Sequence, residues 1–202
     1  YSINEISLKN INLLKLKNSK INIINVNFNG KKTFDKVSKK SNNYIKNCCE
    51  IALKLVRKTK AKVLINGPVS KKYFLNNKFP GMTEYFAAKT GFRNKEVMLI
   101  YNSQNSVSPV TTHIPLKKVI KFISKKNIIK NVVTINSFYK NYLKKTPSFA
   151  ITGINPHCET ADKFSEENKI ILPAIKILKR KKIKVSGPYP ADTIFLKKNL
   201  KK

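Results

Sequence analysis

Short apolar runs alternate along this chain with longer segments of helical periodicity, and this alternation restricts the fold more than any other feature. Apolar runs of strand length occur at residues 62–66 and 149–152, and Gly67-Pro68 closes the first of them. Strands that alternate with helices are typical of parallel strands joined by helical crossovers. The pattern therefore predicts an α/β fold with a largely parallel sheet.

The expected helices each place apolar residues three to four positions apart. They cover residues 41–56, 83–89, 116–125, 128–143 and 165–181. The expected strands cover residues 21–28, 62–66, 96–101, 107–112 and 149–152, and a short apolar stretch at 184–185 leads into a rigid loop at 187–192. Ser41 and Ser165 are expected to cap helices, and Gly91 to end one. Pro173 should kink the last helix or mark a late start.

The net charge of +32, from 42 Lys+Arg against 10 Asp+Glu, raises the question of a nucleic-acid partner. Arginine, which phosphate and base recognition favour, occurs only at positions 57, 93 and 180. The lysines are spread over nearly every expected element and accompany abundant Asn and Ile, the residues that AT-rich codons supply. Codon bias is therefore the preferred explanation, and a basic nucleic-acid-binding module remains the competing class.

The three cysteines, Cys48, Cys49 and Cys158, do not predict a disulfide framework. Two of them are adjacent within a helical pattern, and their number is odd, so a reducing cytoplasm is expected. No signal-peptide pattern is visible, and no apolar run approaches the length that crosses a membrane.

The chain contains only two histidines, and both follow strand-like runs in loops that contain proline. His113 lies in Thr-Thr-His-Ile-Pro, and His157 in Ile-Asn-Pro-His-Cys. Imidazole is the commonest metal ligand, and sites gather at strand ends in α/β folds. One shared metal site is therefore predicted, the alternative being that each ring caps a strand end by hydrogen bonding. Candidates for a third ligand are Asp162, Glu159, Cys158 and Asp192.

Three further segments could contact an anionic or polar ligand. Lys71 ends the turn 66–71, which exposes backbone N–H groups before an expected helix; an ordinary tight turn is the alternative. Thr83 could bind a phosphate or serve as the N-cap of its helix. Asp192 ends the Gly-Pro-Tyr-Pro-Ala-Asp loop, which would hold its carboxylate rigidly. No Gly-x-Gly-x-x-Gly fingerprint occurs, so a Rossmann cofactor site is not supported.

Taken together and in order, these segments resemble the 4-hydroxythreonine-4-phosphate dehydrogenase family of pyridoxal phosphate biosynthesis. Their spacing and order agree with the family across almost the whole chain. The matching residues are Gly67-Pro68-Val69-x-Lys71, Thr83-Glu84, Thr111-Thr112-His113-x-Pro115-Leu116, Asn155-Pro156-His157, Glu166-Glu167 and Gly187-Pro188-x-Pro190-Ala191-Asp192-Thr193.

The resemblance implies an α/β/α sandwich like that of the isocitrate and isopropylmalate dehydrogenases. Residues 1–202 would be the central part of this two-domain fold, incomplete at both ends, and the sequence does not resolve a domain boundary within them. The resemblance further implies a homodimer with shared active sites, and NAD or NADP as the cofactor. His113 and His157 would bind a divalent cation such as zinc, magnesium or cobalt. Thr83 and Lys71 would contact substrate, and Asp192 would be the catalytic residue that handles or orients a proton.

Three departures from the family pattern accompany the resemblance. Met82 occupies the position of a histidine that contacts substrate in the family, so a related threonate or erythronate phosphate is an alternative substrate. The family's third metal histidine would lie beyond Lys202, together with further substrate contacts, and the family's opening Gly-rich segment is absent. The expected reaction is a metal-dependent, NAD-linked oxidation and decarboxylation of 4-phosphohydroxy-L-threonine. A non-catalytic remnant that keeps the core is a further alternative.

Overall fold

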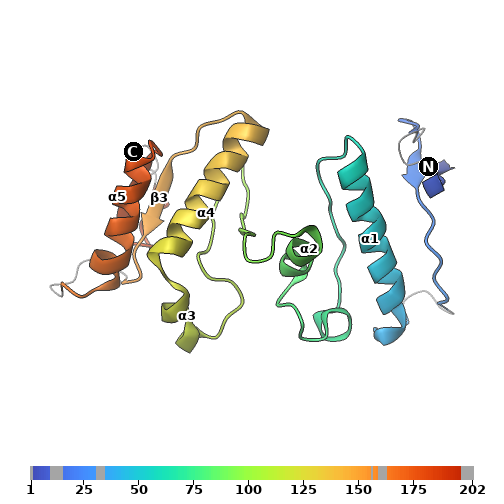
Figure 1. Cartoon of the computed structure of the whole chain (residues 1–202), viewed down its shortest axis with the longest axis horizontal. Helices are drawn as coiled ribbons and strands as arrows, with labels where there is room; N and C mark the ends of the chain where they lie inside the picture. Colours follow the sequence, from blue (N-terminus) through green and yellow to red (C-terminus); the bar gives the residue numbers. More distant parts are fainter. Residues whose placement is uncertain (1, 10–15, 31–34, 156, 159–162, 197–202) are drawn as a thin grey trace. The chain divides into compact units, whose positions relative to one another are not determined.

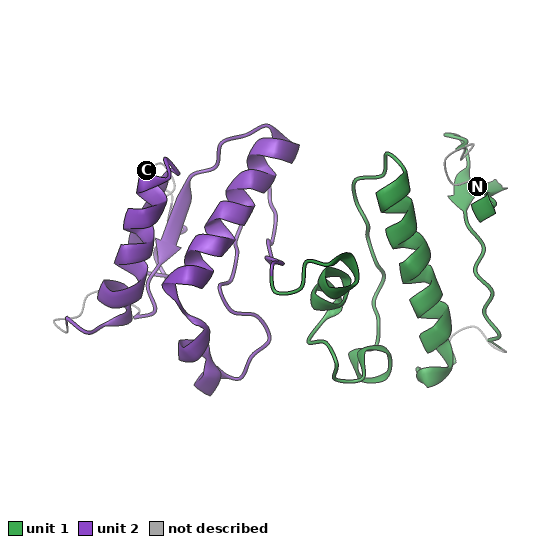
Figure 2. Ribbon diagram, viewed as in Figure 1, with its two compact units in different colours: residues 1–94 green, residues 95–202 purple. Residues whose placement is uncertain are grey.

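The computed structural model describes residues 2–9, 16–30, 35–155, 157–158 and 163–196. The chain divides into two compact units, Tyr1–Asn94 and Lys95–Lys202 (Figure 2). The sequence had left this boundary unassigned.

The first unit combines a small parallel strand pair with helices (Figure 1). Strands β1 and β2 pair in parallel, with Ile3 opposite Ile21. The elements are β1 (Ile3–Glu5), β2 (Ile21–Ile23), the 3-10 turn η2 (Lys39–Ser41), α1 (Asn42–Lys58), the π-helical turn η3 (Lys71–Leu75) and α2 (Met82–Thr90). Helix α1 thus confirms the helix expected after Ser41. Ser41 itself makes no side-chain capping bond, whereas the Ser38 hydroxyl accepts one from the N–H of Lys40 in η2.

The core of the first unit lies where α1, η3 and α2 contribute apolar side chains. Cys49, Leu75 and Tyr85 are buried together, and partly buried side chains surround them. Gly91 ends α2 with a φ of 80°, in the left-handed region that favours glycine, as the sequence predicted. These contacts fix the start of α2 relative to η3.

Two strand predictions in the first unit are wrong or too long. Only Ile21–Ile23 of the expected strand 21–28 pairs with a neighbour. Residues 62–66 form no strand in the described part of the chain, and Ile65 is 92% exposed. An extended apolar run becomes a buried strand only if another strand satisfies its main-chain groups, and no described strand pairs with this one.

The second unit places two helices against a parallel strand pair, β3 and β4. Helices α4 and α5 (Figure 1) pack on each other, and α5 also packs on β4 by its contacts. The elements are α3 (Leu116–Phe122), α4 (Lys125–Phe138), the π-helical turn η4 (Tyr139–Leu143), β3 (Phe149–Thr152), the π-helical turn η5 (Glu167–Ile171), α5 (Leu172–Arg180) and β4 (Val185–Tyr189). The expected helices and the strand at 149–152 are confirmed here.

The core of the second unit lies between α4, α5 and the strand pair. Ala174 and Leu178 are fully buried on the inner face of α5, and Ile128 and Val132 of α4 belong to the same cluster. Pro173 is the second residue of α5, directly after η5, so it lies inside a continuous helical segment, at the change from π-helical to α-helical turns. Ser165 contributes as expected, because its hydroxyl accepts a hydrogen bond from the N–H of Asn168 at 3.3 Å.

Two further predictions need correction in this unit. The expected strands 96–101 and 107–112 reduce to one antiparallel bridge, Ile100 with Val107, whose side chains are 56% and 41% exposed. The loop expected from Gly187 instead begins inside β4, which pairs with β3 through Tyr189 opposite Thr152. Gly187 has a φ of 125°, and a Cβ there would overlap the carbonyl oxygen of Ile151. Glycine therefore permits this irregular pairing, as at a β-bulge.

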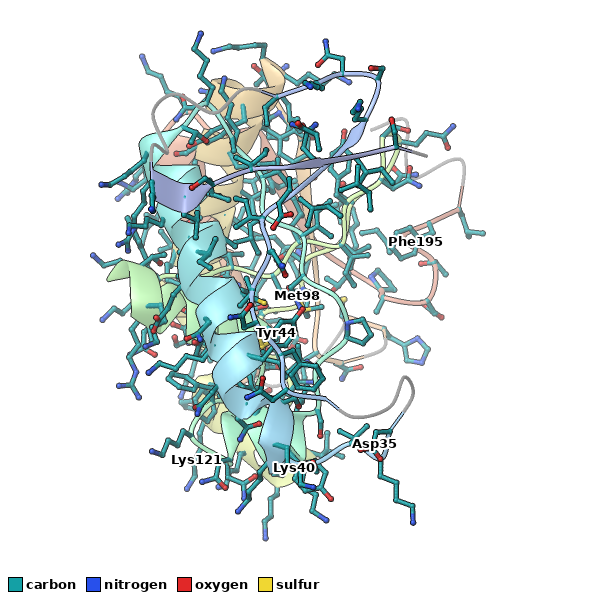
Figure 3. All side chains as sticks on the ribbon, turned by 90° about the vertical axis from the view of Figure 1, so that its right-hand side faces the viewer. Asp35, Lys40, Tyr44, Met98, Lys121 and Phe195 are labelled. Atoms are coloured by element: carbon teal, nitrogen blue, oxygen red, sulfur yellow. The ribbon has the colours of Figure 1, made fainter. Side chains whose placement is uncertain are left out.

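The surface of both units is rich in lysine. Lys40 and Lys121 are exposed and project outward in Figure 3. Lys46 and Glu50, one turn apart on α1, form an exposed ion pair at 3.9 Å. Among the described helices, none has both the length and the apolar character that spanning a bilayer requires.

Candidate functional site

The loop that carries His157 begins directly after β3, at Gly153. The N–H of Gly153 donates to the carbonyl of Tyr189 at 3.0 Å, which ties the start of the loop to the end of β4. His157 itself is exposed. The sequence expectation of a histidine just beyond a strand end is therefore met by the backbone.

The carboxylate of Glu167 anchors this loop through hydrogen bonds to the loop's main chain. Its Oε1 accepts hydrogen bonds from the N–H groups of Ile154 and Asn155, each at 2.9 Å. The side chain is only 3% exposed. Burial raises the pKa of Glu167, but the hydrogen bonds from the N–H groups of Asn155, Glu167 itself and Ile154 outweigh it, so the pKa is lowered. A buried anion thus accepts from the main chain of the loop.

Asn155 connects that anchored main chain to the histidine. Its side-chain Oδ1 accepts the N–H of His157 at 3.1 Å, and its carbonyl accepts the N–H of Cys158 at 3.1 Å. Such an Asx turn fixes the backbone two residues further on. Cys158 completes the turn with a φ of 56°.

His113 lies in a second turn of the same unit, between the Ile100–Val107 bridge and α3. Its φ is 50°, and its side chain is exposed. A left-handed backbone is uncommon for residues other than glycine, although asparagine, aspartate and histidine are enriched there. Pro115 follows as the N-cap of α3.

The expected third ligand is not found among the described residues. No group of three or more His, Cys, Asp or Glu side chains that could hold a metal gathers in that part of the chain. Cys158 and Asp192 therefore do not complete a three-ligand cluster there, and Asp192 is exposed in the turn after β4. Glu159 and Asp162 lie outside the described residues, as does Pro156 of the histidine motif. Imidazole is a common ligand of divalent transition metals, so the ligand roles of His113 and His157 stay predictions.

The remaining predicted contacts belong to the first unit, around Gly81. A Cβ on Gly81 would lie 3.0 Å from Glu84 Oε2 and 4.0 Å from Lys71 Nζ, so both charged groups reach this glycine. Gly81, not Thr83, is the N-cap of α2, which rules out the capping alternative for Thr83. Thr83 is exposed on the first turn of α2, and its role as a substrate contact stays a prediction.

Met82 has a structural role that the sequence did not suggest. It begins α2 and packs against the buried cluster of Cys49, Leu75 and Tyr85. The apolar side chain at this position therefore contributes to the core of the first unit.

Glu167 belongs to a motif noted in the sequence, but the sequence assigned no function to it. A signal was present, because Glu167 falls in helical phase with the buried Ile171, Ala174 and Leu178. An acidic residue on the apolar face of a helix is rarely buried without a partner.

Comparison with known families decides where the chain belongs. The family described as pyridoxal phosphate biosynthetic protein PdxA matches residues 1–202, which include both histidine loops and Glu167. The chain belongs to the PdxA family.

Curated PdxA relatives are named 4-hydroxythreonine-4-phosphate dehydrogenase. The protein from Sulfurihydrogenibium sp. (strain YO3AOP1) is 38% identical over 150 residues, which cover 72% of this chain and 46% of the relative. The protein from Wigglesworthia glossinidia brevipalpis is 38% identical over 142 residues, covering 68% of this chain and 42% of the relative. The chain thus spans less than half the length of these PdxA relatives.

Solved structures agree on the α/β fold. A putative 4-hydroxythreonine-4-phosphate dehydrogenase from Salmonella typhimurium superimposes with a TM-score of 0.82 at 25% identity, over 99% of this chain and 62% of that one. The enzyme of that name from Klebsiella pneumoniae gives a TM-score of 0.79 at 23% identity, over 98% and 62% respectively. The predicted α/β fold class is confirmed.

Proposed function

We propose that this chain serves the metal-dependent, NAD-linked oxidation and decarboxylation of 4-phosphohydroxy-L-threonine in pyridoxal phosphate biosynthesis. The observation that carries the proposal is the PdxA match over all 202 residues, because it includes both histidine loops. The curated relatives carry the name of that activity.

In this proposal two histidines supply metal ligands and one aspartate handles a proton. His113 and His157 are the ligands, and a divalent cation held there would make the substrate's secondary hydroxyl more acidic. Asp192, exposed after β4, handles or orients the proton. NAD or NADP, when bound, would supply the hydride acceptor for the oxidation, and the β-keto acid formed would release its carboxyl group as CO2.

Lys71 and Thr83 are proposed as anion contacts. Lys71 Nζ lies near Gly81 at the start of α2, where it adds positive charge for a phosphate. Thr83, exposed on the first turn of α2, offers a hydroxyl that can donate to a phosphate oxygen.

A metal titration tests the ligand assignment. We expect His157→Ala and His113→Asn each to weaken Co²⁺ or Zn²⁺ binding by at least about tenfold, because each removes one imidazole. Asparagine is the better replacement at position 113, because it tolerates the φ of 50°. Asn127→Ala, on α4, provides a control outside both turns. Unchanged metal affinity in both histidine variants would contradict the assignment.

A related phosphorylated hydroxy acid is a second candidate substrate. The observation that favours it is Met82, which packs into the apolar cluster and offers no hydrogen-bonding group comparable to histidine. Binding of 4-phosphohydroxy-L-threonine and of a threonate phosphate should be compared by calorimetry in the wild type and in Met82→His. Tighter binding of the threonine derivative by Met82→His supports a changed specificity, and equal binding in both proteins contradicts it.

We also propose that the protein acts as a homodimer with shared active sites in the cytoplasm. Large apolar side chains such as Ile65 and Leu116 are more than four-fifths exposed, which is consistent with an additional interface. The odd number of cysteines, two of them adjacent on α1, favours a reducing compartment. Sedimentation analysis tests the dimer, and a monomer at all concentrations contradicts it.

A further inference from the structure

A buried acid supports the His157 loop, and none of the roles proposed above uses it. Glu167 is the least exposed of the buried polar residues in the described part of the chain, at 3%. Its Oε1 accepts two main-chain N–H groups, from Ile154 and Asn155, rather than a basic side chain. A carboxylate in this position stabilises one conformation of the loop, because hydrogen bonds from main-chain N–H groups to an ionised acceptor are stronger than those to a neutral one.

The neighbouring residues are arranged so that this contact can form. A Cβ on Gly153 would lie 3.1 Å from Glu167 Oε1 and would overlap Cys158 Sγ, so only glycine leaves room for both groups. Glu167 begins η5, which continues into α5, and the buried face of α5 anchors this segment in the core. The carboxylate therefore lies on a segment that the core of the second unit holds in place.

The contact is transmitted to the histidine through one residue. The main chain of Asn155 is held by Glu167, while its side chain accepts the N–H of His157 at 3.1 Å. A shift of Asn155 therefore moves the acceptor that sets the backbone of His157. The connection therefore runs from Glu167 through Asn155 to the main chain of His157. Among the described residues, Glu167 forms no hydrogen bond with the His157 imidazole.

We propose that Glu167 is a positioning residue, which sets the direction of the His157 side chain by fixing the main chain of Ile154 and Asn155. The functional part of this inference rests on the proposed role of His157 as a metal ligand. The structural part, the fixing of the loop, does not depend on that role.

The test combines three measurements on the 202-residue chain: amide hydrogen exchange, the NMR chemical shift of the His157 ring, and Co²⁺ titration. We expect Glu167→Ala to accelerate exchange at Ile154 and Asn155 by about tenfold or more, because both N–H groups lose their acceptor. Co²⁺ affinity should fall by about 10- to 100-fold, the usual effect of removing a residue that orients a ligand. Glu167→Gln keeps an acceptor oxygen and should recover part of both losses. Glu166→Gln is the matched control and should change neither.

Asn155→Ala tests the connection separately and remains informative if Glu167→Ala does not fold. It keeps the N–H that Glu167 accepts but removes the acceptor of the His157 N–H. Protection of Ile154 should persist while Co²⁺ affinity falls.

The outcomes distinguish this inference from the proposed function. Wild-type exchange at Ile154 and Asn155 in Glu167→Ala would overturn it, as would faster exchange with an unchanged chemical shift of the His157 ring. If His157→Ala leaves Co²⁺ affinity unchanged, the ligand assignment fails instead. The exchange rates and the His157 ring signal then still decide whether Glu167 positions the loop.

Discussion

Gly153 carries no side chain at the point where Glu167 and Cys158 approach the loop after β3. We expect Gly153→Ala to lower the free energy of unfolding by about 1–3 kcal/mol, because the added methyl group overlaps Cys158 Sγ. Gly67→Ala is a suitable control, because a Cβ at Gly67 has nothing within 4 Å. Urea unfolding of both variants measures the difference. Equal effects would show that the space at Gly153 is not restricted.

The lowered pKa of Glu167 predicts how stability depends on pH. Its hydrogen-bonded carboxylate binds a proton less readily in the folded state than in the unfolded state. The resulting stabilisation is complete above the ordinary pKa of a glutamate and is lost as the pH falls through the lowered folded value. The wild type should therefore lose more stability than Glu167→Gln between pH 6 and pH 3 in urea unfolding. A difference between the two proteins that stays constant with pH would contradict this sign.

Sequence reasoning identified the two histidines at the residue scale but not the carboxylate that supports one of them. His113 and His157 were visible because imidazole is rare in this chain and both copies follow strand-like runs. Their roles as ligands stay predictions. The contact of Glu167 with Asn155 depends on how η5 returns to the end of β3, and no local pattern encodes that return.

At the scale of elements, helix α5 should contribute unequally along its length. Leu178 is fully buried between α4 and the strands, whereas Leu172 is 42% exposed. Leu178→Ala should lower the free energy of unfolding by about 2–5 kcal/mol, through lost burial and the cavity that remains. Leu172→Ala in the same helix should cost clearly less. Urea unfolding compares the two, and similar losses would contradict the packing of α5.

Helices were predicted better than strands for a physical reason. The apolar period of α1 or α4 lies within one segment, so it can be recognised without knowing what packs against it. Strand formation at residues 62–66 requires a partner strand, and the local composition carries no information on whether that partner is present. The pairing of β4 through Gly187 was missed for a related reason, since glycine and proline indicate a turn until an irregular register accommodates them.

At the scale of the whole molecule, the net charge of +32 should oppose compaction. Sodium chloride screens the repulsion between lysines, because the Debye length falls from about 30 Å at 0.01 M to about 8 Å at 0.15 M. We therefore expect the Tm to rise over this range, as measured by circular dichroism at low protein concentration. A falling Tm would show that stabilising ion pairs such as Lys46–Glu50 outweigh the repulsion.

Each of the two described strand pairs has only two members, so each presents outer main-chain groups to any strand that approaches. At low ionic strength, positively charged molecules repel one another. The lysines that destabilise the folded state therefore also oppose aggregation. Concentrated solutions should turn cloudy once counterions screen that repulsion, a change that light scattering would follow. Added salt would then raise the thermal stability of the single molecule and promote its aggregation at high protein concentration.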